Sequence, residues 1–188
     1  MPLKVKKNNV EQTINLKEVF GVDFSGKENL KQLIGQAIID KIVERTKNRK
    51  GIIINEKGHG TEVALEAPYS QPYVDSLAFK AAGKSKGKVN MSLSGDMLGL
   101  LDIKKIQGNT ITIGWNDSEQ NPKAYNHMIG DTVPKRPFFG VSNEELKDLK
   151  SEFGADVKEA IRVKQDEGKA AFNNLVLGLL EELNGSEG

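Results

Sequence analysis

The segment that decides the expected fold reads Tyr125-Asn126-His127-Met128-Ile129-Gly130-Asp131-Thr132-Val133-Pro134-Lys135-Arg136-Pro137-Phe138-Phe139-Gly140. Prolines at 134 and 137 fix the backbone on either side of Arg136 and cannot donate backbone hydrogen bonds. We therefore expect the segment to be extended, rigid and non-helical, which would hold Arg136 and Phe138 in place for docking. The alternative is an ordered loop whose phenylalanines cap the core while Arg136 pairs with a nearby carboxylate.

The segment resembles the signature of the phage virion morphogenesis (tail completion) family. That signature has an aromatic-x-His element, a glycine, a Pro-x-Arg-Pro-Phe-x-Gly core and a serine-led acidic helix. Here the matching residues are Tyr125, His127, Gly130, Pro134, Arg136, Pro137, Phe138, Gly140 and Ser142-Asn143-Glu144-Glu145. Residues 90–98 are similar to the family's serine-glycine strand-to-helix element, so the resemblance covers about residues 65–150. Phe139 and Val141 depart from it, because leucines are usual there.

The resemblance implies an α+β fold: a curved antiparallel β-sheet with a packed N-terminal helix, extended loops and C-terminal helices. It also implies a structural virion protein of a tailed bacteriophage, which acts at the head–tail junction or tail end as a tail completion, terminator or neck protein. Copies would form a ring, with a hexamer favoured, next to neck, connector, tail tube or sheath proteins. The expected location is the virion, after assembly in the host cytoplasm.

We expect the loop from Tyr125 to Gly140 to supply part of a subunit or partner interface, because aromatic residues and arginine often carry interface energy. Phe138 and Phe139 would be apolar anchors, and Arg136 would pair across the interface or brace the loop. The expected interface residues are Tyr125, His127, Pro134, Arg136, Pro137, Phe138 and Phe139.

A second candidate contact is the lysine-rich stretch with Lys80, Lys84, Lys86 and Lys88. Small residues separate these lysines, which is typical of a mobile positive loop that contacts DNA phosphates or an acidic neighbour. No aromatic residue lies between them, so any DNA contact would be non-specific. The alternative for this stretch is a loop that only increases solubility. A contact with DNA would suit a neck stopper or adaptor protein, or a DNA-binding module outside the virion.

Composition restricts the class of function. A net charge of +1 argues against a strongly basic nucleic-acid binder. The absence of cysteine excludes a thiolate nucleophile and a cysteine zinc site, and two histidines are too few for a histidine-only metal site. No motif places a nucleophile beside a base, so the sequence predicts no enzyme, cofactor or metal site. We also expect no membrane association, because the N-terminal residues include no apolar run long enough for a signal peptide or a membrane span.

The 188 residues divide into an expected N-terminal arm (1–24) with room for one short strand, a single α+β domain (25–153) and a C-terminal helical extension (154–188). Ser25 and Glu28 predict a capping box that opens an amphipathic helix to about residue 48. Strands are expected at 52–54 and 61–65, around a Gly58-His59-Gly60 turn.

A long loop is expected from Pro68 to Lys88, followed by a hairpin of 101–106 and 110–115 joined by a glycine-asparagine turn. Ser142 and Glu145 form a second predicted capping box, which opens a helix ending at Gly154. A last helix is expected from about 156 to 183.

Overall fold

A computed structural model describes residues 3–55, 60–66, 68–81, 83–84, 86, 91 and 96–185. The chain divides into two compact units, Met1–Lys150 and Ser151–Gly188. The first unit combines antiparallel sheets with several helices, so the expected α+β class is confirmed. The curvature of the main sheet stays a prediction.

The main sheet has four strands in the order β1-β2-β6-β5, all paired antiparallel. The strands are β1 (Leu3–Lys6), β2 (Asn9–Asn15), β5 (Asp102–Gln107) and β6 (Thr110–Gly114). The hairpin β5–β6 confirms the expected one, and its turn residue Gly108 has a positive φ of 54°. Ile111, Ile113 and Trp115 are fully buried, as their alternation predicts.

The expectation of a separate N-terminal arm is wrong. Strand β2 lies between β1 and β6, so these residues form half of the main sheet. Val10 and Ile14 are buried, and the backbone N–H of Val10 donates to Asn121 Oδ1 at 2.9 Å. The short helix α1 (Leu16–Phe20) follows, and the backbone N–H of Leu16 donates to Asn109 O in the β5–β6 turn.

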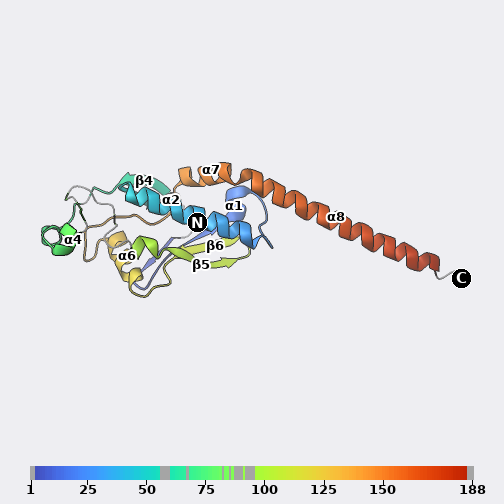
Figure 1. The fold of residues 1–188 in the computed structure, drawn as a ribbon, viewed down its shortest axis with the longest axis horizontal. Coiled ribbons are helices and arrows are strands. Elements are labelled where there is room, and N and C mark those ends of the chain that lie inside the picture. The colour runs from blue at the N-terminus through green and yellow to red at the C-terminus, as the bar shows by residue number, and fades with distance from the viewer. Residues whose placement is uncertain are drawn as a thin grey trace. The chain divides into compact units, whose positions relative to one another are not determined.

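Helix α2 (Glu28–Lys47) packs on β5 and β6 and confirms the predicted amphipathic helix (Figure 1). Gly35 permits this close packing, because a Cβ at that position would lie 2.5 Å from Ile103 Cδ1. The predicted capping box at its start does not form. Helix α2 begins at Glu28 without a side-chain cap, while the Ser25 hydroxyl donates to Asp23 Oδ1.

A second, two-stranded antiparallel sheet pairs β3 (Lys50–Ile54) with β4 (Gly60–Ala64), which confirms the two predicted strands. Most of the expected turn between them lies outside the described residues. The expected long loop after β4 contains two short helices, α3 (Gln71–Val74) and α4 (Leu77–Ala81). Tyr69, Tyr73 and Phe79 hold this part together, with ring centroids 5.2–5.3 Å apart.

Four further helices complete the described structure: α5 (Asp96–Gly99), α6 (Gln120–Ile129), α7 (Asn143–Glu152) and α8 (Gly154–Gly185). Helix α8 confirms the predicted last helix and has 32 residues. Every side chain from 165 to 177 is exposed, including Phe172 at 65% and Leu175 at 62%. Among the described residues, no helix combines the length and apolar character that crossing a bilayer requires.

Candidate functional site

Helix α6 occupies the first part of the segment from Tyr125 to Gly140, so the expectation of a wholly non-helical segment is wrong there. The Asp117 carboxylate starts the helix by accepting the backbone N–H groups of Glu119 and Gln120 at 2.7 and 2.9 Å. Gly130 ends it in a left-handed conformation, with φ of 80°. The prolines at 134 and 137 restrict the backbone only after this point, so they leave Tyr125 and His127 free to be helical.

The rest of the segment is non-helical, as expected, and is tied to its surroundings by backbone hydrogen bonds. The N–H of Arg136 donates to His127 O at 2.7 Å, and the N–H of Ile52 donates to Pro137 O at 2.6 Å. The second contact joins the loop to strand β3. Gly51 makes room for it, because a Cβ there would lie 2.3 Å from Pro137 O.

Arg45, in the last turn of helix α2, holds the end of this loop in place. Its guanidinium binds both carboxylate oxygens of Glu145 at 2.6 and 2.5 Å and donates to the carbonyls of Phe138 and Gly140, each at 2.8 Å. Arg45 is 5% exposed and Glu145 6%. Burial lowers the pKa of Arg45, while the Glu145 carboxylate opposes that shift. We call these two residues the Arg45–Glu145 clamp.

Glu145 also forms the predicted second capping box, which is confirmed. The backbone N–H of Ser142 donates to Glu145 Oε2 at 2.7 Å, and the backbone N–H of Glu145 donates to Ser142 Oγ at 3.0 Å. One carboxylate therefore starts helix α7 and neutralises Arg45, so the loop, α2 and α7 meet at a single buried point.

The structure corrects the expected role of the two phenylalanines. Phe138 and Phe139 are fully buried, with ring centroids 6.0 and 5.0 Å from that of Trp115. A side chain with no exposed surface cannot anchor a neighbouring subunit in this conformation. The alternative reading, in which the phenylalanines cap the core, describes their placement.

Arg136 also lies inside the unit, at 3% exposure. Its Nη2 donates to Pro68 O at 2.7 Å, and its guanidinium carbon lies 5.3 Å from the centre of the Tyr69 ring. Burial lowers the pKa of Arg136, and the charge interactions with Tyr69 and Tyr73 oppose that shift. These contacts brace the loop against the aromatic segment, so pairing across an interface, the other role expected for Arg136, does not fit its burial.

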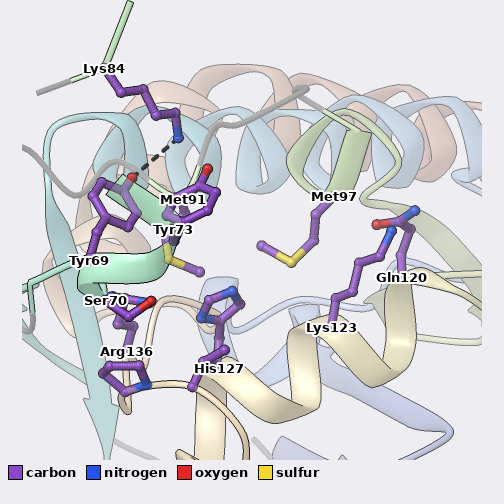
Figure 2. Close-up of a pocket in the computed structure, with 12 residues that line it drawn as sticks. Tyr69, Ser70, Tyr73, Lys84, Met91, Met97, Gln120, Lys123, His127 and Arg136 are labelled. Carbon is purple, nitrogen blue, oxygen red and sulfur yellow. Dashed lines mark hydrogen bonds between the residues drawn. The ribbon is translucent and has the colours of Figure 1, made fainter. Parts of the chain in front are cut away.

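A cavity of about 370 Å³ lies between this aromatic segment, helix α6 and the loop. We call it the Tyr69 cavity. Figure 2 shows Tyr69 and Tyr73 on one side, Gln120 and Lys123 on the other, and His127 between them. The described residues that line it are Tyr69, Ser70, Tyr73, Lys84, Met91, Met97, Gln120, Lys123, His127, Val133, Pro134 and Arg136.

The cavity brings together residues from both expected sets. His127, Pro134 and Arg136 come from the expected interface, and Lys84 comes from the lysine-rich stretch. Tyr125 is half-buried on α6 and Pro137 lies against β3, and neither lines the cavity.

The other expected lysines lie elsewhere. Lys80 is exposed on α4, and Lys86 Nζ donates to Gln71 Oε1 at 2.7 Å. Lys88 lies outside the described residues. Lys84 Nζ donates to the Tyr69 hydroxyl at 3.2 Å, so at least Lys84 and Lys86 are held by side-chain partners.

Sequence reasoning missed Gln120 and Lys123, which share one face of α6 with His127. A spacing of three and then four residues puts these side chains in line on a helix. That signal is present in the sequence, but it is usable only once the segment is read as helical. Tyr69 and Tyr73 carry a similar signal, which the prolines at 68 and 72 obscure.

His127 is a neutral polar group of the cavity at neutral pH. Burial, and then the charge of Arg136, lower its pKa to about 4. Within the part of the chain that the structure describes, its Nδ1 atom is buried without a hydrogen-bond partner. The same holds for Oε1 of Gln120, whose side chain is 5% exposed.

Acid should weaken the fold through His127. In the unfolded chain the His127 side chain binds a proton near pH 6.5, whereas in the folded chain it does so only near pH 4. The free energy of unfolding therefore falls as the pH drops from about 6.5 to about 4. The loss approaches about 3 kcal/mol at pH 4 for a shift of this size. Urea unfolding at a series of pH values measures it, and His127→Gln should show a shallower slope. Equal slopes for the two proteins would contradict this assignment.

Over the described ranges, no group of three or more His, Cys, Asp or Glu residues is arranged to hold a metal ion. Comparison of the chain with known protein families, curated proteins and solved structures gave no significant match in any of the three. The likeness to the virion morphogenesis signature therefore rests on the motif residues alone.

Proposed function

We propose that this chain is a structural virion protein of a tailed bacteriophage, which acts at the head–tail junction or tail end as a ring of copies. The family resemblance supports the setting. The observation that supports assembly into a ring is a row of exposed apolar side chains on α8: Phe172 at 65%, Leu175 at 62% and Val176 at 36%. We call these three residues the α8 stripe.

The α8 stripe has the spacing of a helix-packing surface. Residues three and four positions apart lie on one helix face, so Phe172, Leu175 and Val176 are neighbours. The sequence continues this spacing with Leu179 and Leu183. Helices in proteins gain most of their stability from packing an apolar face against another surface. Contiguous apolar surface that is exposed to water therefore commonly marks a protein interface.

A second copy of this chain is the occupant that the proposal assigns to the α8 stripe. Helix α8 has 32 residues and therefore extends over roughly 48 Å. Repeating one head-to-tail contact by a fixed rotation closes a ring when the rotation allows it. This moves the expected interface from the buried phenylalanines at 138 and 139 to α8.

Sedimentation of the wild-type chain and of Phe172→Ser/Leu175→Ser tests this assignment. The wild type should assemble with rising concentration, and the double variant should remain monomeric with unchanged unfolding of the first unit. Asn174→Ser is the matched control, because it changes an exposed residue on the opposite face of the same helix. Assembly that is equal in all three proteins would sink the α8 assignment.

The neck stopper or adaptor that contacts DNA is the runner-up. It gains less support, because Lys84 lines the Tyr69 cavity and Lys86 is engaged by Gln71. Filter binding to duplex DNA over a range of salt concentrations separates the two roles. A steep salt dependence that disappears in Lys80→Gln/Lys84→Gln/Lys86→Gln would favour the runner-up.

A further inference from the structure

The Tyr69 cavity has the charge of an anion site. Lys84 and Arg136 lie on its aromatic side and Lys123 lies on the opposite side (Figure 2). Among the described lining residues none is acidic. Three cations from separate parts of the chain therefore face one concave space, and an anion placed there would interact favourably with all of them.

The cavity also has an apolar part and unused polar atoms. Met91, Met97 and Val133 supply apolar walls, and the volume of about 370 Å³ is within the range of small-molecule pockets. Oε1 of Gln120 accepts no hydrogen bond from any residue that the structure describes, although the atom is buried. Leaving such an atom unpaired is unfavourable, and a ligand N–H or O–H would relieve it.

From these features we infer that the Tyr69 cavity binds a small organic anion: a carboxylate or phosphate carried on an apolar body that also presents a hydrogen-bond donor. The anionic group lies among Lys84, Lys123 and Arg136, the apolar body lies against the methionines, and the donor reaches Gln120. His127 adds a hydrogen-bonding atom without adding charge, because it is neutral near pH 7. This site is independent of the proposed ring, since all of its residues belong to the first unit.

The dye 8-anilinonaphthalene-1-sulfonate is a suitable probe, because it combines an anionic group, apolar rings and an N–H donor. N-phenyl-1-naphthylamine is its matched neutral analogue, with the same rings and N–H but no sulfonate. The full-length chain should bind the anionic dye at least about tenfold more tightly than the neutral one, as expected for a site that selects charge. Equal affinity for the two dyes would overturn the proposal.

Two variants place the binding in the cavity. Lys123→Glu reverses an exposed cation of the cavity and should weaken binding of the anionic dye at least about tenfold. Lys147→Glu makes the same change in net charge at an exposed position on α7 outside the cavity and should leave the affinity unchanged. Equal effects of the two substitutions would show general charge attraction and overturn the proposal.

NMR of the histidine side chains gives an independent readout, because the chain has only two histidines. The His127 resonance, assigned with a His59→Asn variant, should shift during the titration and saturate with the fluorescence. A fluorescence increase that leaves this resonance unmoved would place the dye elsewhere, for example on α8, and would contradict the proposal.

Competition identifies the chemistry of the anion. Phenyl phosphate and 3-phenylpropionate carry a phosphate and a carboxylate on similar apolar bodies. Stronger displacement of the dye by the first assigns a phosphate ligand, and stronger displacement by the second assigns a carboxylate. Displacement by neither would overturn the proposal.

Discussion

Replacing Arg45 with methionine is expected to lower the free energy of unfolding by about 3–5 kcal/mol. Methionine keeps much of the apolar stem but removes the charge, so the Glu145 carboxylate would be left buried without its partner. The carbonyls of Phe138 and Gly140 would lose the same donor group. Typical domains are stable by about 5–15 kcal/mol, so this loss is a large share of the total.

Urea unfolding followed by the fluorescence of Trp115 measures the effect, because this buried side chain is the only tryptophan. Lys47→Met is the matched control: it removes an exposed cation from the same helix and should change stability by less than about 0.5 kcal/mol. Adding Glu145→Gln to Arg45→Met should recover part of the loss, since the unpaired charge disappears. If Arg45→Met were no more damaging than Lys47→Met, the Arg45–Glu145 clamp would not stabilise the fold.

Truncating Phe138 to alanine should cost about 3–5 kcal/mol, because its ring is fully buried beside Trp115. The removed ring leaves a space that the surrounding core fills only in part. The measurement is again urea unfolding, with the native mass recorded for the same samples.

Phe172→Ala on α8 provides the contrasting variant, because it removes the same ring from a position that is 65% exposed. It should leave the unfolding of the first unit nearly unchanged while weakening assembly. A Phe138→Ala protein as stable as wild type that fails to assemble would restore the interface role first expected for that residue.

Local sequence signals predicted much of the fold. Apolar spacing located α2, alternation located the β5–β6 hairpin, and the pair Ser142 and Glu145 marked the start of α7. A short strand was allowed in the N-terminal arm, but β2 was not located, because Gln12, a polar residue, takes a buried position between Val10 and Ile14. The residue that should have been apolar breaks the alternation on which strand recognition depends.

The candidate site was less accessible to sequence reasoning, because it depends on contacts between distant residues. Arg45 resembled one of several cations at the end of a helix, and nothing local showed that it is buried with a carboxylate 100 residues away. The burial of Phe138 and Phe139 likewise depends on Trp115. An aromatic pair in a proline-rich loop fits a docking surface and a core cap equally well until its neighbours are known.

Negative-stain imaging of the purified full-length chain, over a range of concentrations, tests the proposed function most directly. Closed rings of one copy number, with a hexamer favoured, are expected, and they should be lost in Phe172→Ser/Leu175→Ser. A wild-type chain that remains monomeric at every concentration, and that forms no ring on isolated phage tails, would contradict it.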